Sequence, residues 1–161
     1  MRQRQLPSRL IWVTAWCIWL FDFATKQWAV SALATTPVKV LGDFLTLTLV
    51  RNSGAAFSFA TGFAIVFALL SLAVVIGVTY YSTRISSRGW QATAGLLLGG
   101  VLGNLTDRIF REPSFLSGNV IDWIQIPNWP VFNIADSAIV VAAFLAFYLT
   151  MRNIPPITPV R

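Results

Sequence analysis

The chain has 161 residues, of which 56 % are hydrophobic and only 11 % are charged, whereas soluble domains carry about 25 % charged residues. It contains no histidine and one cysteine. This composition excludes Ser-His-Asp and Cys-His catalysis, His-ligated zinc, cysteine-cluster metal sites and intramolecular disulfides. We therefore expect a membrane protein without metal or cofactor, whose chemistry comes from carboxylate, amide, hydroxyl, Lys, Arg or backbone groups.

Four apolar stretches are long enough to cross a bilayer as helices, which takes about 20 residues. They cover residues 10–30, 62–81, 90–106 and 131–150 and predict one integral membrane domain over residues 1–161. The alternative for the first stretch is a cleaved signal peptide. Asp22 and Lys26 would interrupt the apolar core of such a peptide, so a retained span is favoured.

The distribution of basic residues predicts the orientation of these spans. One side of the membrane receives only arginines, and they are Arg2, Arg4, Arg9, Arg84, Arg88, Arg152 and Arg161. Positively charged loops stay in the cytoplasm, so both termini are expected inside and every acidic residue on the outer side. The net charge of +6 is thus a topology signal, and we expect no nucleic-acid partner.

The two outer connections differ in pattern. In the first, leucines at 45, 47 and 49 alternate with threonines after a turn at Gly42-Asp43, which predicts a β-hairpin within an outer β region of about 37–60. The second connection, 109–130, contains Pro113, Gly118, Pro127 and Pro130 and is expected to be irregular.

Ionisable residues from three spans are expected at one depth. At 1.5 Å per residue, Asp22, Asp107 and Asp136 lie roughly 20 to 28 Å from the inner ends of their spans, in a hydrocarbon core of about 30 Å. Such groups usually mark a functional interior. Two interpretations remain open at this point: a hydrolytic site, or an ion or proton relay through these three aspartates.

Neighbouring cations separate the carboxylates into two kinds. Asp22 can pair with Lys26 at i,i+4, and Asp107 is followed by Arg108 and Arg111. Asp122 and Asp136 have no cation within four residues on either side. Brought together, two such aspartates would share a proton. An ionised carboxylate that activates water and a protonated one that polarises a carbonyl could then hydrolyse an amide.

Five short motifs occur in order along the chain and carry a resemblance. They are Asp22-Phe-Ala-Thr-Lys26, Asn52-Ser-Gly54-Ala-Ala56-Phe57, Gly103-Asn104-Leu-Thr-Asp107-Arg108, Gly118-Asn-Val-Ile-Asp122-Trp123 and Phe132-Asn133-Ile-Ala-Asp136. Over about residues 10–150 the sequence resembles the bacterial lipoprotein signal peptidases, or signal peptidase II. One departure is that the stretch 109–117 is longer than is usual in that family.

The resemblance implies a monomeric four-span aspartyl endopeptidase of the bacterial inner membrane, with an outer β-cradle and its active site facing the periplasm. Its substrate would be a prolipoprotein with a diacylglyceryl cysteine, drawn from the membrane lipid and cut just before that cysteine. By the same resemblance, Asp122 and Asp136 are catalytic, and Asp22, Lys26 and Asp107 are structural supports. The residues that would shape the substrate site are Asn52, Gly54, Asn104, Arg108 and Asn133. For Gly54, close approach of another chain and simple turn formation are equal alternatives.

Overall fold

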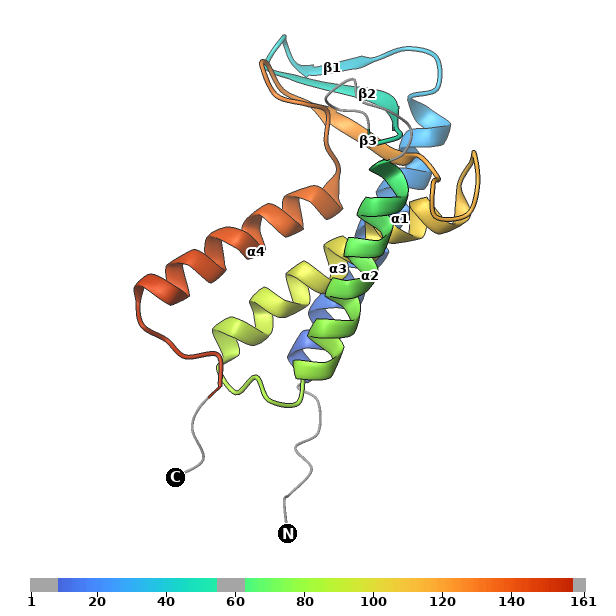
Figure 1. The fold of residues 1–161 in the computed structure, drawn as a ribbon. Coiled ribbons are helices and arrows are strands. Elements are labelled where there is room, and N and C mark those ends of the chain that lie inside the picture. The colour runs from blue at the N-terminus through green and yellow to red at the C-terminus, as the bar shows by residue number, and fades with distance from the viewer. Residues whose placement is uncertain (1–8, 55–62, 158–161) are drawn as a thin grey trace.

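The computed structural model describes residues 9–54 and 63–157, and these residues form four α-helices and three β-strands (Figure 1). In chain order the elements are α1 (Arg9–Ala32), β1 (Val38–Leu41), β2 (Leu45–Asn52), α2 (Phe63–Tyr81), α3 (Arg88–Phe110), β3 (Val120–Gln125) and α4 (Ile134–Met151). The prediction of a mainly helical fold with a small antiparallel sheet is confirmed. The part of the expected β region from 55 to 60 lies outside the described residues.

Two of these helices, α2 and α4, are long and apolar enough to cross a membrane by length and composition. Helices α1 and α3 are longer, but each carries charged residues near the end that faces the sheet. The helices lie where the four apolar stretches predicted them. Their spanning of a membrane, and the cytoplasmic location of both termini, stay predictions.

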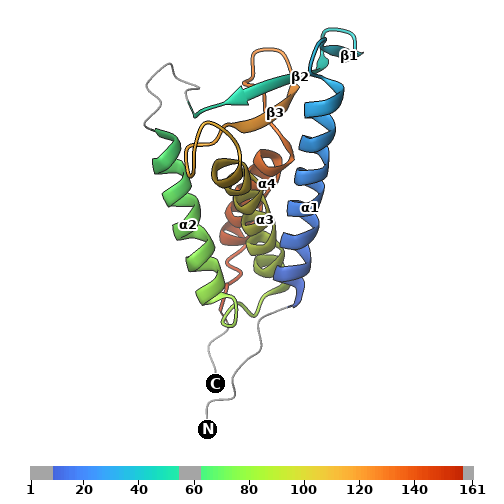
Figure 2. The same ribbon diagram turned by 90° about the vertical axis from the view of Figure 1, so that its right-hand side faces the viewer.

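Helix α3 packs against the other three helices (Figure 2). Its glycines make this possible, because small residues let helix backbones approach closely. A Cβ atom added at Gly99 would lie 2.7 Å from the carbonyl oxygen of Ala15 in α1, and one added at Gly100 would lie 2.5 Å from that of Ala135 in α4. The close packing brings the start of α4 and the later turns of α1 against the last turns of α3.

The three strands form one antiparallel sheet in the order β1-β2-β3. The sheet sits at one end of the helices, while α1 begins and α4 ends at the opposite end (Figure 1). The predicted hairpin is confirmed as β1 and β2. In the register of β2 with β3, Val50 lies opposite Asp122 and Asn52 opposite Val120.

One local prediction is wrong. The connection 109–130 is not irregular throughout, because Val120–Gln125 forms β3 and carries Asp122. The helix bounds differ from the approximate bounds of the apolar stretches by a few residues. Helix α3 runs to Phe110, so Asp107 and Arg108 belong to its last turns, and α4 begins at Ile134, because Asn133 is its N-cap.

Candidate active site

All ten residues nominated from the sequence lie in or beside one polar cluster between the ends of the helices and the sheet. Helix α1 contributes Asp22 and Lys26, α3 contributes Asn104, Asp107 and Arg108, and the start of α4 contributes Asn133 and Asp136. The sheet side contributes Asn52, Gly54 and Asp122. Hydrogen bonds and ion pairs connect nine of them, and the Arg108 guanidinium lies next to Gly54.

Lys26 is the centre of the charged part of the cluster. Its Nζ atom lies 2.7 Å from Asp22 Oδ2 and 2.8 Å from Asp107 Oδ2, and all three side chains are at least 97 % buried. Asp107 also pairs with Arg111. The pairs Asp22–Lys26 and Asp107–Arg111 agree with the sequence prediction. The ion pair between Lys26 and Asp107 joins two helices, and no sequence pattern predicts it. Asp22 and Asp107, two of the three aspartates of the proposed ion or proton relay, thus both form ion pairs with Lys26.

Asn104 connects this charged group to Asp136. Its Oδ1 atom accepts hydrogen bonds from Lys26 Nζ at 3.0 Å and from Asn133 Nδ2 at 3.2 Å. A lysine ammonium group can only donate, so it fixes the carbonyl end of the Asn104 amide toward itself. The amide nitrogen therefore faces Asp136 and donates to its Oδ1 atom at 2.7 Å.

Asn133 connects the two nominated catalytic aspartates. As the N-cap of α4 it accepts from the backbone N–H of Asp136 at 2.8 Å, while its own backbone N–H donates to Asp136 Oδ2 at 3.2 Å. This reciprocal pair is a capping box. Its Nδ2 atom also donates to Asp122 Oδ1 at 2.7 Å. Asn133 is fully buried and hydrogen-bonds to both carboxylates, and its contact with substrate stays a prediction.

Asp122 enters the cluster from β3, and its side chain is 2 % exposed. Asn52, on the neighbouring strand, donates to its Oδ2 atom at 2.9 Å. Burial raises the pKa of Asp122 from 3.8 to about 6, although the amide hydrogen bonds act in the opposite direction; the charge of Asp136 adds to the increase. Within the described residues, neither Asp122 nor Asp136 forms an ion pair.

The loop between α3 and β3 sets the position of Asp122. The backbone N–H of Gly118 donates to the Arg108 carbonyl at 3.1 Å, and that of Ile121 donates to Asp107 Oδ2 at 3.2 Å. A Cβ atom at Gly118 would clash with the carbonyl oxygens of Asp107 and Arg111. The long stretch 109–117 therefore returns onto the end of α3 and directs β3 over the cluster.

Gly54 and Arg108 lie together at the edge of the cluster. Gly54 has a φ angle of +91°, which side chains rarely adopt, and its N–H donates to Asn52 Oδ1 at 2.8 Å. A Cβ atom there would be only 3.4 Å from the Phe67 ring and 3.6 Å from Arg108 Nη2, which are ordinary contacts. The positive φ angle favours a glycine here, and close approach of another chain stays a prediction. Arg108 is 7 % exposed, and its guanidinium lies 5.6 Å from the centre of the Phe67 ring.

The cluster opens to the surface through a cavity of about 440 Å³. Asn52 and Asp122 line it together with Val50, Arg51, Ser53, Pro130 and Val131. A molecule in this cavity can reach Asp122 without entering the helix bundle. In the part of the chain that the structure describes, no group of three or more His, Cys, Asp or Glu side chains is arranged to hold a metal ion.

Comparisons with known proteins all lead to one kind of enzyme. The profile of the family described as signal peptidase (SPase) II matches residues 14–152. A lipoprotein signal peptidase of Mycobacterium leprae is 44 % identical over 92 % of this chain and 76 % of its own length. One from Rhodococcus jostii is 44 % identical over 96 % and 77 %. A solved bacterial membrane enzyme is 25 % identical, with a TM-score of 0.79 over 94 % of this chain and 99 % of that one.

Proposed function

The chain belongs to the signal peptidase II family, and from this premise we propose that it is an aspartyl endopeptidase with Asp122 and Asp136 as its catalytic pair. The family cleaves signal peptides from prolipoproteins, and its members are membrane proteases. The finer assignment rests on one observation: Asn133 donates to Asp122 through its side chain and to Asp136 through its backbone. One buried residue thereby holds both carboxylates.

The surroundings of the two carboxylates suit different roles. Asp136 accepts from the Asn104 amide and from the Asn133 backbone at the first turn of α4, where the helix dipole favours a negative charge. Asp136 is therefore the general base. Asp122 is buried, and its pKa is raised to about 6, so it keeps a proton more readily than an ordinary aspartate. Asp122 is therefore the general acid.

The reaction follows from these roles. Asp136 takes a proton from water as the water oxygen attacks the carbonyl carbon, and Asp122 gives its proton to the carbonyl oxygen. The resulting gem-diol collapses when Asp122 takes back a hydroxyl proton and Asp136 passes its proton to the amide nitrogen. The C–N bond then breaks and both carboxyl groups return to their starting states. Asn104, held by Lys26, keeps an N–H donor directed at Asp136 throughout.

The substrate is a prolipoprotein whose cysteine carries a diacylglyceryl group, and cleavage occurs just before that cysteine. Helices α1 to α4 span the bacterial inner membrane with both termini in the cytoplasm, so the sheet and the Asp122 cavity face the outer side. A signal peptide is an apolar helix and the diacylglyceryl group is a lipid, so both approach the cluster sideways from the bilayer. The enzyme acts as a monomer with Asn52, Gly54 and Arg108 next to the cleaved bond.

A cleavage assay with two matched precursors tests this function. The purified chain in detergent micelles receives a diacylglyceryl precursor peptide or the same peptide with a free cysteine thiol, and mass spectrometry identifies the products. We expect one cut, directly before the cysteine, in the lipidated peptide only. Equal cleavage of both peptides, or a cut elsewhere, would contradict the proposed substrate.

A further inference from the structure

A second cavity lies beside the one that contains Asp122. It has a volume of about 530 Å³ and is lined by Asp43, Thr46, Gln125, Ile126, Pro127, Asn128, Trp129 and Pro130. Pro130 lines both cavities, so the loop after β3 is a common wall. The two cavities are therefore neighbours, and the second lies farther from Asp122 than the first.

The register of the sheet gives the distance between the two cavities. Val50 lies opposite Asp122 in the first, and Thr46 lies opposite Gln125 in the second. Val50 and Thr46 are four positions apart along β2, which corresponds to at most about 13 Å, because the pairing is irregular between Leu47 and Val50. A peptide bound at Asp122 would therefore reach the second cavity after about four extended residues.

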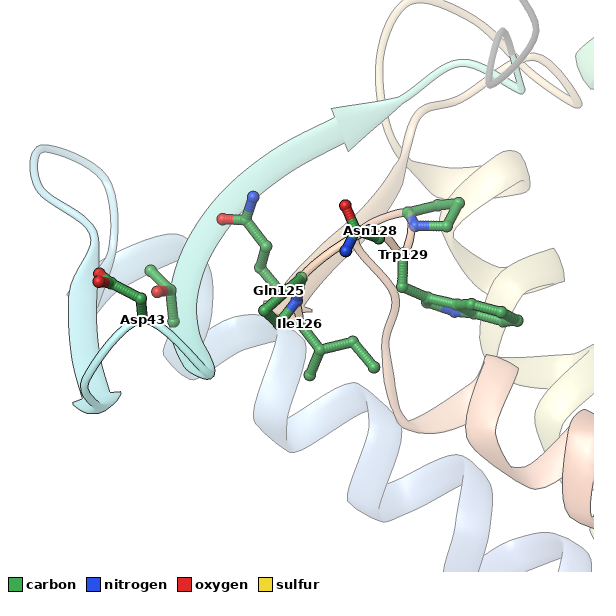
Figure 3. A pocket seen from close by; sticks show the side chains of 8 residues that line it. Asp43, Gln125, Ile126, Asn128 and Trp129 are labelled. Carbon is green, nitrogen blue, oxygen red and sulfur yellow. The ribbon is translucent and has the colours of Figure 1, made fainter.

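Half of the residues that line the second cavity are polar, and its one acidic residue has a cationic neighbour. The side chains of Gln125 and Asn128 are exposed and extend to the same side of the ribbon, with the Trp129 ring nearby (Figure 3). Trp129 is 61 % exposed. Asp43 forms an ion pair with Lys39. Side-chain amides both donate and accept hydrogen bonds, so they can bind a peptide backbone whatever its side chains are.

We propose that this second cavity binds the mature side of the substrate, about three to six residues beyond the cleaved bond, as an extended segment. The inference rests on the proposed function, because it takes Asp122 as the place of cleavage. An endopeptidase must accommodate chain on both sides of the bond it breaks. The signal peptide is apolar and helical and fits lipid and the apolar helices, whereas all eight residues of the second cavity come from strands and loops.

Two precursor peptides separate this inference from the catalytic assignment. Both carry the same signal sequence and lipidated cysteine, but one ends one residue after the cysteine and the other ends eight residues after it. The short peptide cannot reach the second cavity and the long one can. Kinetics are measured in one detergent at fixed micelle concentration for the unaltered chain and for the double variant Gln125→Ala with Asn128→Gly.

A matched control exists at the far end of the molecule. Asn128 has a φ angle of +58° and Asn153, after α4, has one of +53°, and both are exposed. Glycine accepts this conformation without strain, so Asn128→Gly and Asn153→Gly remove the same amide from similar backbones. Asn153 lines neither cavity.

For the long peptide, we expect the double variant to raise KM about tenfold with kcat unchanged, since two amide hydrogen bonds are lost. For the short peptide, the double variant and the unaltered chain should have the same KM, and Asn153→Gly should match the unaltered chain with both peptides. The inference is overturned if the unaltered chain shows equal KM for the two peptides, or if the double variant raises both equally. If neither peptide is cleaved by the unaltered chain, the proposed function fails instead.

Discussion

The Nδ2 atom of Asn133 lies 2.7 Å from Oδ1 of Asp122 while the same side chain caps the helix that carries Asp136. The capping oxygen and the donating nitrogen belong to one amide, so its orientation is fixed from both sides. One side chain therefore both caps the α4 N-terminus and holds the Asp122 carboxylate. Substitutions at Asn133 can separate these two roles.

Replacement of Asn133 by serine should leave α4 capped and impair catalysis. Serine is as good an N-cap as asparagine, but it does not reach Asp122. We expect Asn133→Ser to lower the free energy of unfolding by about 1 to 3 kcal/mol, because buried acceptors lose their donor, and to lower kcat by up to about 100-fold. Asn133→Ala loses the cap as well and should cost about 1 kcal/mol more. Thermal unfolding and initial rates give both quantities, and equal kcat in Asn133→Ser and the unaltered chain would contradict the positioning role.

Loss of the buried lysine should be far more costly than loss of an exposed one. Lys26→Met leaves Asp22 and Asp107 without their shared cation, and breaking a buried pair costs about 3 to 5 kcal/mol. It also removes the donor that orients Asn104, so any folded fraction should have reduced kcat.

The control for this change is Lys39→Met, which breaks the exposed i,i+4 pair with Asp43. Exposed ion pairs contribute little, so this variant should unfold at the same temperature as the unaltered chain. Both variants are measured by thermal unfolding in one detergent. A similar loss of stability in both would show that the buried pairs of Lys26 stabilise the chain no more than the exposed pair of Lys39 does.

The rate should fall as the pH rises through about 6. Burial raises the pKa of Asp122 to about 6 in the folded chain, above its usual value of 3.8, so the general acid loses its proton over that range. The pKa of Asp122 is higher in the folded chain than in the unfolded chain. Its contribution to the stability of the folded chain is therefore present at low pH and is lost as the pH rises from about 4 to about 6.

Two variants check the origin of this pH dependence. The Asn52 amide lowers the pKa of Asp122, so Asn52→Ala should move the alkaline limb of the kcat/KM profile to higher pH. This shift is expected whether or not the maximum value of kcat/KM also changes. Asp122→Asn should remove the change in stability between pH 4 and 6. An alkaline limb that stays in place in Asn52→Ala would contradict the assignment of Asp122 as the acid.

Replacement of Gly118 by alanine should reduce both stability and activity. Alanine there would press against the carbonyl oxygens of Asp107 and Arg111, and relief of this clash must move β3 and with it Asp122. We expect Gly118→Ala to lower kcat and to cost about 1 to 3 kcal/mol. Gly77→Ala in α2 is the control, because nothing lies within 4 Å of its added Cβ and alanine favours a helix. Equal activity of the two variants would show that the loop does not position Asp122.

The helices and the β1–β2 hairpin could be predicted because their signals are local. Apolar runs mark the helices, and alternating leucines with a Gly-Asp turn mark the hairpin. The strand β3 could also have been found, because Val120-Ile-Asp-Trp-Ile is a run of strand-forming residues between Gly118 and Pro127. The number of prolines and glycines around it favoured an irregular loop.

The contacts of the candidate site were only partly accessible from the sequence. The pairs Asp22–Lys26 and Asp107–Arg111 follow from i,i+4 spacing. The hydrogen bond from Asn52 to Asp122 spans 70 positions of the chain, and that from Lys26 to Asn104 spans 78. Such contacts depend on how the strands pair and the helices pack, which no spacing along one element encodes.

The direct measurement for the central proposal is the cleavage rate of the lipidated precursor by Asp122→Asn and Asp136→Asn, with Glu112→Gln as control. Glu112 is an exposed acidic residue that lines neither cavity. The account predicts that each of the first two variants folds, binds precursor and loses cleavage by at least about a thousandfold, while Glu112→Gln keeps full activity. Processing at the normal rate by either folded Asp122→Asn or Asp136→Asn would contradict the two-aspartate mechanism.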